Sequence, residues 1–374
     1  MKTEQVRWLD GGWSGASALS EAQLVLAFGS RSAIQSARPG AEAERRYPRA
    51  ILFGCSTAGE IDGTRVRDDS VVLTAIRFEK SSCLPAFTDL RTPDDSHAAG
   101  QRLAGSLPPA GLRHVLVLSD GLNVNGSELT RGLREALPTG TSLTGGLAGD
   151  GADFKETEVL YNGETAARRV GVVGLYGDQL QIGYGSLGGW DPFGPDRLIT
   201  RSRGNVLFEL DGQSALALYK KYLGEHASGL PATGLLFPLS LKLPDTEERV
   251  VRTILAVDEQ QESMTFAGDV PEGLYANFMK ANFDRLIDGA HAAAVTSCSS
   301  LRSSRPDLAI LISCVGRKLV LKQRIEDEVE AVREVVGDQA TLAGFYSYGE
   351  ISPFVPHARC ELHNQTMTIT TFKE

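Results

Sequence analysis

The sequence has few cysteines and histidines, and they lack the spacing of a metal site. Five cysteines, an odd number, are spread over 374 residues, and no C-x-x-C pair occurs. A disulfide framework or a zinc knuckle needs an even or closely spaced set, so neither is indicated. The six histidines are dispersed, and none belongs to a recognisable metal-ligand pair.

Long apolar runs and an excess of basic residues are also absent. The longest strongly apolar stretches, such as residues 308–315, fall far short of the ~20 residues that cross a bilayer. The N-terminus lacks the apolar segment of a secretory signal. The formal net charge of −9 argues against a nucleic-acid partner or an anionic membrane surface. We therefore expect a reduced, cytoplasmic protein with no membrane span and no nucleic-acid partner.

The short motifs of common nucleotide-binding and hydrolytic sites are missing. No G-x-x-x-x-G-K-[ST] loop and no G-x-S-x-G elbow occurs. The stretch GYGSLG at 183–188 matches G-x-G-x-x-G, but two prolines follow where a phosphate-binding helix would continue. The sequence therefore predicts no nucleotide site.

Three segments share one plan: apolar strand, amphipathic helix, second apolar strand and glycine-rich corner. They begin at about residues 23, 114 and 308, and their clearest helices are expected at 127–137 and 321–336. Continuous apolar runs indicate strands covered on both faces. Short strand–helix–strand connections place the paired strands parallel, so each corner lies at a carboxyl strand end, where α/β sheets hold ligands.

Two of these corners repeat one frame. ILFGCSTAGEI at 51–61 and TLAGFYSYGEI at 341–351 align with Gly54 on Gly344 and Glu60 on Glu350. The glycines could let a ligand approach the backbone, with the carboxylates beside it. Equally, the glycines could serve sharp turns and the carboxylates could cap backbone N–H groups. Both readings stay open on the sequence.

The predicted fold class is α/β. We expect two domains built from repeated strand–helix–strand units, with mixed, largely parallel sheets and added antiparallel hairpins at 170–185 and 250–267. A shift to a Gly- and Pro-rich composition after residue 223 places the domain junction near 205–215.

The predicted ligand pocket lies at the carboxyl strand edges. Arg317 could hold a ligand carboxylate in a bidentate fork, and Tyr346 and Tyr348 could supply a flat wall. Cys55 has no histidine in a partner position, so no catalytic residue is predicted. The predicted pocket residues are Gly54, Cys55, Ser56, Thr57, Glu60, Arg317, Tyr346 and Glu350.

Several motifs in order carry a family resemblance. GCSTAGEI, LTGGLAGDG, PATGLLFPLSLKLP, SCVGRK, GFYSYGEISP and LHNQTMTITTF together resemble the FIST proteins, from about residue 25 to the C-terminus. The resemblance implies a FIST N-like domain at 22–211 and a FIST C-like domain at 212–374. It also implies a bacterial, intracellular sensor of a small ligand such as an amino acid, not an enzyme. Its signal would pass to a separate partner such as a histidine kinase or a cyclic-di-nucleotide enzyme.

Alternatives to this interpretation remain. One FIST branch binds haem, senses nitric oxide and regulates a histidine kinase. Haem would be non-covalent here because C-x-x-C-H is absent, and His363 is the first candidate ligand, with His226 and His291 as others. A thiol-dependent hydrolase using Cys55 with Glu60 or Glu350, and a scaffold without any ligand, are the alternatives from other classes.

Overall fold

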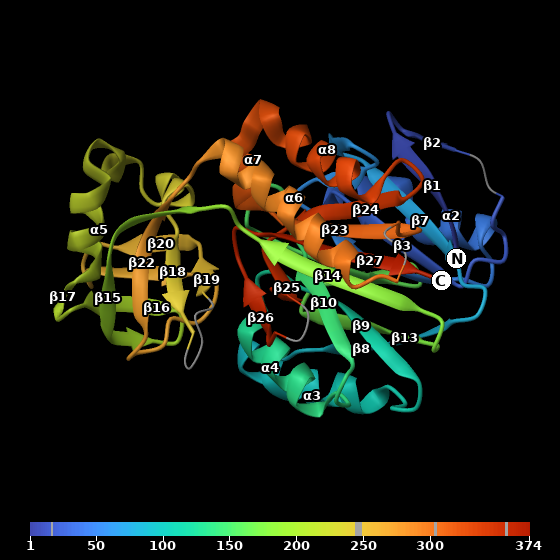
Figure 1. Cartoon of the computed structure of the whole chain (residues 1–374), viewed down its shortest axis with the longest axis horizontal. Helices are drawn as coiled ribbons and strands as arrows, with labels where there is room; N and C mark the ends of the chain where they lie inside the picture. Colours follow the sequence, from blue (N-terminus) through green and yellow to red (C-terminus); the bar gives the residue numbers. More distant parts are fainter. Residues whose placement is uncertain (16–17, 244–248, 303–304, 356–357) are drawn as a thin grey trace.

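A computed structural model of the chain describes residues 1–15, 18–243, 249–302, 305–355 and 358–374. Figure 1 shows a large α/β body and a smaller antiparallel half-barrel that projects from one side of it. The chain reaches the half-barrel through residues 188–190 and returns through residues 281–282. Both termini lie on the side of the body away from the half-barrel (Figure 1).

Three mixed sheets form the body, and they share one strand order. The first runs β12 (Glu164–Ala166), β11 (Val159–Tyr161), β4 (Ile51–Ser56), β3 (Leu24–Gly29), β7 (Val71–Arg77), β1 (Lys2–Leu9), β2 (Gly12–Ser14). The second runs β26 (Cys360–His363), β25 (Gly349–Pro353), β10 (Ser142–Leu147), β9 (Leu112–Ser119), β13 (Arg169–Tyr176), β8 (Ser82–Asp89). The third runs β6 (Arg65–Arg67), β5 (Glu60–Asp62), β24 (Thr341–Ser347), β23 (Leu308–Cys314), β27 (Met367–Lys373), β14 (Gln181–Leu187).

The three sheets exchange strands in a ring. Strand β5 follows β4 in the chain but pairs with β24 of the third sheet, and β25 follows β24 but pairs with β10 of the second. Strand β11 follows β10 but pairs with β4 of the first sheet. Each unit therefore completes the sheet of another unit, which gives the body an internal pseudo-threefold arrangement.

Helices cover the outer faces of the sheets. Helices α1 (Arg31–Ala37) and α2 (Pro39–Arg46) contact the first sheet, and α3 (Ser96–Ser106), preceded by η1 (Pro93–Asp95), and α4 (Gly126–Ala136) contact the second. Helices α6 (Phe283–Ser299), α7 (Val315–Leu321) and α8 (Ile325–Val336) contact the third, with η4 (Lys322–Arg324) between the last two. In Figure 1 α3 and α4 lie at the bottom of the body and α6 to α8 at the top.

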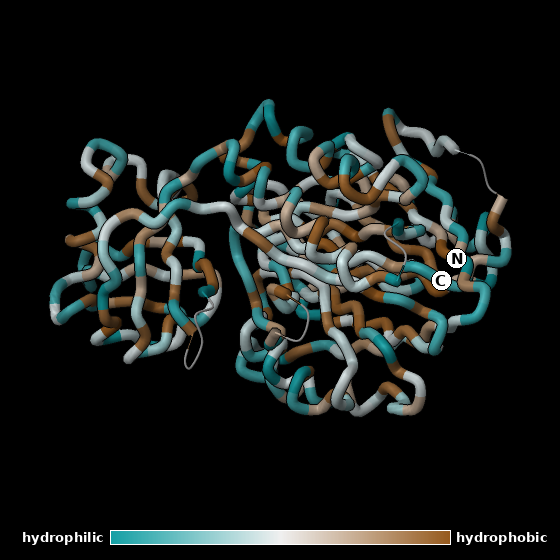
Figure 2. Tube along the Cα trace, in the orientation of Figure 1, coloured by the Kyte–Doolittle hydropathy of each residue, from teal (hydrophilic) through white to brown (hydrophobic). Residues whose placement is uncertain are grey.

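In the first strand of each parallel pair (β3, β9 and β23), successive side chains point alternately into two different apolar cores. One set faces a central apolar core shared by the three sheets: Leu24, Leu26 and Phe28 of β3, Leu116 and Leu118 of β9, and Leu308, Ile310 and Ile312 of β23. The residues between them face the outer helices. Both faces are therefore buried, which accounts for the continuous apolar runs in the sequence and for the concentration of brown in the centre of the body in Figure 2.

The half-barrel is antiparallel throughout its described strands. Its strand order is β19 (Arg249–Arg252), β18 (Leu239–Lys242), β22 (Tyr275–Lys280), β15 (Asp191–Arg203), β16 (Val206–Leu210), β21 (Ser263–Phe266), β20 (Ile254–Asp258), with β17 (Gln213–Ser214) beside β16. Helix α5 (Ala215–Leu223) packs on it, and η2 (Gly224–Gly229) and η3 (Ala232–Leu236) follow. Its apolar residues form a core of their own, separate from the central core.

The predicted α/β class with mixed sheets is confirmed. The expectation that these sheets are largely parallel is wrong, because each sheet of the body has one parallel strand pair and its other described pairs are antiparallel. The hairpin expected at 250–267 is β20–β21. The hairpin expected at 170–185 is wrong, because β13 pairs with β9 and β8 in the second sheet whereas β14 pairs with β27 in the third. The turn between them carries the chain from one sheet to another.

The boundary predicted at residues 211 and 212 stays a prediction. Strands from both sides of it share the second and third sheets, so the body is built from the beginning and the end of the chain.

Candidate functional site

Three glycines occupy equivalent positions in the second parallel strand of each unit: Gly54, Gly145 and Gly344. A Cβ atom built on them would lie 1.9, 1.9 and 1.8 Å from a carbonyl oxygen of the first parallel strand. No side chain fits at such a distance, so glycine is needed for the close approach of the two strands. The repeated glycine therefore has a packing reason in all three units.

The corners that follow these strands close on one another at the end of the pseudo-threefold axis. Three backbone hydrogen bonds link them in a ring: Ala58 N to Tyr346 O (2.8 Å), Tyr348 N to Leu147 O (3.2 Å), and Gly149 N to Ser56 O (3.0 Å). The N–H groups of the corners thus bond to the neighbouring units, which leaves them unavailable to a ligand.

Glu60 is fully buried beside the first corner. Its carboxyl oxygens accept hydrogen bonds from Thr57 Oγ1 and Ser70 Oγ, both at 2.5 Å. Burial raises the pKa of Glu60 to about 7, against the lowering effect of these two hydroxyls. The carboxyl group therefore joins the corner to the strand that follows it.

Glu350 has the same surroundings in the third unit. It is fully buried, and it accepts from Ser347 Oγ at 2.6 Å and from Thr366 Oγ1 and N at 3.0 and 3.2 Å. Burial raises its pKa to about 8. Both glutamates follow a hydroxyl residue by three positions, which is a corner-stabilising arrangement that needs no ligand.

Arg317 is also fully buried. Its Nη2 and Nε atoms donate to Glu328 Oε2 at 2.7 and 3.0 Å, Nη2 also donates to Leu286 O at 2.7 Å, and Nη1 donates to Gly188 O at 2.5 Å. Tyr346 donates its hydroxyl to the other Glu328 oxygen at 2.7 Å. The structure thus joins Arg317 and Tyr346 through Glu328 in a buried network, and the predicted fork on a ligand carboxylate is occupied by this internal carboxylate.

Cys55 and Ser56 lie in the interior as well. The Cys55 side chain belongs to the central core, where burial raises the pKa of the thiol well above its ordinary value. No hydrogen bond from a histidine to this thiol is found in the described part of the chain. Ser56 Oγ accepts from Glu158 N at 2.9 Å. The environment of Cys55 is that of an inert thiol.

The three histidines considered as haem ligands differ in their burial. His363 is fully buried, its Nε2 bonds Ser352 O at 2.7 Å, and its ring lies 4.1 Å from that of Phe354. Burial lowers the pKa of His363 to about 4. His226 and His291 are exposed on the surface.

A cavity of about 950 Å³ opens between the half-barrel and the body. From the body it is lined by the loops after β9 and β10, by the end of β23 with the start of α7, and by Tyr348. From the half-barrel it is lined around residues 204–205, 229–235, 253–255 and 266–269. It therefore lies at the carboxyl ends of parallel strands, but none of the eight predicted pocket residues lines it.

An aromatic pair stands in the wall of this cavity. The rings of Phe154 and Tyr348 stack with centroids 4.4 Å apart and an angle of 14°. The Tyr348 hydroxyl donates to Asp150, whose carboxylate also accepts from the backbone N–H groups of Phe154, Lys155 and Glu156 at 2.8–2.9 Å. These bonds fix the loop, so the ring of Phe154 is held in place although 39% of the residue is exposed.

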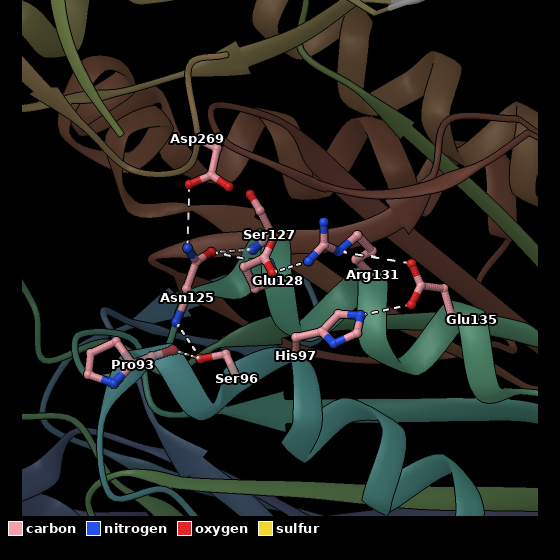
Figure 3. Close-up of polar contacts among 9 residues, drawn as sticks. All are labelled: Pro93, Ser96, His97, Asn125, Ser127, Glu128, Arg131, Glu135 and Asp269. Atoms are coloured by element: carbon pink, nitrogen blue, oxygen red, sulfur yellow. Dashed lines mark hydrogen bonds and ion pairs between the residues drawn. The ribbon is translucent and has the colours of Figure 1, made fainter. Parts of the chain in front are cut away.

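A polar clasp joins the half-barrel to the body at the cavity wall (Figure 3). Asn125 caps α4 by accepting from Ser127 N and Glu128 N, each at 3.1 Å, and its backbone N–H donates to Ser96 Oγ at 2.9 Å. Its amide Nδ2 reaches Asp269 Oδ1 of the half-barrel at 3.4 Å. Asp269 thus meets the positive end of α4, which favours its negative charge.

A second contact lies behind the same wall. Arg252 of the half-barrel donates from Nη1 to Leu362 O of the body at 2.8 Å and from Nε to Asp269 O at 3.1 Å. The arginine is buried, and burial lowers its pKa to about 10. It links the half-barrel to the body without lining the cavity.

The cavity residues that matter most were not predicted. Asn125 could have been found, since an asparagine just before the helical pattern at 127–137 is a strong N-cap signal. Phe154 and Asp269 lie in loops without a motif, so only the folded chain brings them together. Tyr348, which we considered as a flat wall, does line the cavity.

The part of the chain that the structure describes holds neither a candidate membrane-spanning helix nor a candidate metal site. No helix there is both long and apolar enough to cross a membrane. No group of three or more His, Cys, Asp or Glu side chains there could hold a metal ion.

Comparison with known families identifies the chain. The FIST N domain matches residues 23–213 and the FIST C domain matches residues 215–353, so the chain belongs to the FIST family. FIST domains are sensory domains that bind small ligands in signal transduction.

More distant likenesses were also found. An uncharacterized protein of Methanocaldococcus jannaschii is 24% identical over 326 residues, which cover 77% of this chain and 58% of that protein, so the chain spans a little over half the length of this relative. A solved cyanuric acid hydrolase, described as an innovation by structural concatenation, covers the whole chain and 99% of its own at 9% identity and a TM-score of 0.35. The cyanuric acid hydrolase of A. caulinodans has a TM-score of 0.18 at 11% identity over 79% of this chain and all of its own.

Proposed function

We propose that this protein is a sensor whose small ligand occupies the cavity between the half-barrel and the body. The observation that supports this most directly is the position of the cavity: its walls come from two parts that each have a main core of their own and that meet at a small apolar cluster around Met279, Leu286 and Leu321. A ligand that touches both parts binds the closed arrangement better than an open one and shifts the population accordingly.

The connections between the half-barrel and the body are compatible with a closing movement of one on the other. Two short chain crossings and one small apolar cluster join them, and the polar contacts across the cavity wall include Asn125 with Asp269, Arg252 with Leu362 and Thr253 with Asn364. Packed parts joined by short segments are typical of hinge closure around a ligand. The half-barrel is then the moving element that reports the ligand.

The output belongs to another protein in this proposal. A histidine kinase or a cyclic-di-nucleotide enzyme would read the position of the half-barrel, and the chain itself would not be an enzyme. Amino acids are the ligand class that the family resemblance implies, and the cavity is large enough for them, although its described lining holds no cationic side chain for their carboxylate.

A thermal-shift screen with a metabolite panel that includes the amino acids tests this proposal. The blocking variant is Leu255→Trp, because Leu255 lines the cavity and is 45% exposed, so a larger ring fits without disturbing a core. The matched control is Leu84→Trp, at a residue of 44% exposure on the β8 edge. We expect hits that survive in the control and disappear in the blocking variant. Hits that persist in Leu255→Trp would place binding elsewhere and refute the proposal.

Haem is a weaker candidate for this cavity. None of the described histidines lines it, and its described lining holds no arginine or lysine to pair with propionates. His363 has its Nε2 engaged and its ring buried. An absorption spectrum with added hemin and nitric oxide tests this alternative, and a stoichiometric Soret band that shifts with the gas would revive it.

A hydrolase that uses Cys55 also has weaker support. The thiol lies in the central core and not at the cavity, and its raised pKa disfavours the thiolate. Turnover of a thioester that is lost in Cys55→Ala, with folding intact, would favour this alternative over the sensor.

A further inference from the structure

We propose that the ligand of this cavity is a flat, apolar organic cation, such as a protonated amine carried on an aromatic ring system. The inference rests on the proposed function, since it concerns the same cavity. It adds the chemical class of the ligand, which follows from the charge, the shape and the apolar character of the lining.

The lining carries negative charge only. Among its described residues the formally charged side chains are Asp94 and Asp269, and there is no arginine, lysine or histidine. Neither carboxylate has an ion pair in the described part of the chain. A ligand carboxylate or phosphate would therefore meet like charge without a cationic side chain to pair with, whereas an ammonium group would meet opposite charge.

The two carboxylates are not equivalent. Asp269 is half-buried and bonds to the Asn125 amide, and Arg252 lies next to it, with its Nε donating to Asp269 O at 3.1 Å. Part of its charge is thus compensated by the protein. Asp94 is exposed in η1, just before α3, with no such partner among the described residues. We expect Asp94 to contribute more to the recognition of a cation.

The remaining surface of the cavity is largely apolar. Three of its residues, Leu122, Phe154 and Leu255, are 37%, 39% and 45% exposed and lie on segments that are distant in sequence. Large apolar side chains gathered at a concave surface mark a ligand site more often than chance exposure. An apolar ligand body would cover them.

A flat ligand is favoured by the aromatic pair. Tyr348 covers one face of the Phe154 ring, and it is the only ring partner of Phe154 that the structure describes. The loop is fixed by the Asp150 carboxylate, so stacking on Phe154 needs little further ordering. An aromatic ring gains by stacking there, and a cation gains from the negative face of the ring as well.

A matched probe series tests the charge preference. Naphthylmethylamine, naphthylmethanol and naphthoate share a ring system and are cationic, neutral and anionic at neutral pH. We expect the amine to bind about tenfold or more tightly than the carboxylate in titration calorimetry at low salt, with the alcohol between them. The preference should shrink as salt is added, because both carboxylates are reached by solvent.

Single substitutions test the contributions of Asp94, Asp269 and Phe154 separately. Asp94→Asn should reduce the advantage of the amine over the alcohol by about threefold and leave the alcohol unchanged, with a smaller effect for Asp269→Asn. Phe154→Ala should weaken all three probes alike. The exposed Phe87→Ala on the β8 edge serves as the matched control, because it removes a similar ring 47% exposed on another surface.

The outcomes distinguish this inference from the function on which it rests. Naphthoate binding as tightly as the amine, or an amine preference unaffected in both aspartate variants, overturns the cation class. Absence of binding by all three probes also overturns it. In either case the proposed function stands if metabolite hits disappear in Leu255→Trp, and it falls with the inference if they do not.

Discussion

Two regions at the carboxyl ends of the parallel strands differ in almost every respect. The three corners around the pseudo-threefold axis hold repeated motifs, buried carboxyl groups and a closed ring of hydrogen bonds. The cavity beside the half-barrel has an apolar lining and two solvent-reached carboxylates, and Tyr348 is the one residue of the two repeated frames that lines it. The repeated sequence therefore maintains the fold, whereas the proposed ligand cavity lies where the half-barrel interrupts the repeat.

The largest effect is expected at the buried ion pair. Replacing Arg317 by Met leaves the Glu328 carboxylate buried without its cation, which should reduce the free energy of unfolding by about 3–5 kcal/mol. The control is Arg324→Met, which breaks exposed pairs and should change stability by less than about 1 kcal/mol. Urea denaturation measures both.

The same variant tests the comparison directly. In Arg317→Met, ligand hits at the cavity should persist under conditions where the protein is folded, because Arg317 does not line it. A folded variant of near-normal stability that has lost ligand binding would return Arg317 to the role predicted from the sequence.

The second largest effect is expected at the strand glycines. Gly344→Ala places a Cβ atom 1.8 Å from a backbone carbonyl oxygen, and Gly54→Ala and Gly145→Ala are equivalent, so each should lose about 3 kcal/mol of stability. Gly105→Ala is the control, because it lies in α3 with open space around its Cβ position and should stabilise the helix slightly. Three unequal losses would argue against the pseudo-threefold equivalence.

The sequence predicts the units of the body better than their assembly. Strand and helix periodicity locates β23, β24 and α8 because each element buries its own apolar face. The exchange of β5, β11 and β25 between sheets is not predictable in this way, since a short strand pairs equally well with several edges. The hairpin predicted at 170–185 is wrong for the same reason, since β13 and β14 pair in different sheets.

The candidate site shows the same limit. Gly54, Glu60 and Glu350 stand out in the sequence because they recur, and recurrence here reflects a shared packing problem. Phe154 and Asp269 do not recur, and their proximity depends on how two domains dock. A sequence can indicate that a carboxyl strand end holds a ligand, but not which of several such ends is left open by the rest of the chain.

A third prediction concerns pH and the buried glutamates. Burial holds the pKa values of Glu60 and Glu350 at about 7 and about 8 in the folded protein, above the ordinary value for glutamate in the unfolded chain. At pH values between the ordinary pKa of glutamate and these raised values, the folded protein keeps these two carboxyl groups protonated, whereas the unfolded chain has lost the protons. The free energy of unfolding should therefore fall as pH rises, by about 1 kcal/mol per unit for each carboxyl group, and level off above pH 8.

The variant Glu350→Gln removes one of these titrations. Its stability should fall less steeply between pH 6.5 and 8 than that of the wild type, while exposed Glu330→Gln follows the wild type. The window begins at pH 6.5 because the buried histidines, whose pKa values are lowered, affect stability below it. Parallel curves for wild type and Glu350→Gln would mean that this carboxyl group ionises as usual and that the centre is wetter than the structure indicates.

The smallest effect is expected at the clasp, and it separates closure from stability. Asn125→Ala removes the α4 cap together with the bond to Asp269 and should reduce stability by about 1 kcal/mol. Asp269→Ala removes only the long bond and should change stability by less than about 0.5 kcal/mol. Both should raise amide exchange in residues 266–269 relative to the central strands, because both free the half-barrel from α4. If exchange rises in the first variant alone, the cap acts within α4 and the half-barrel is held by Arg252 instead; if it rises in both, the Asn125–Asp269 contact is the part of the wall that opens.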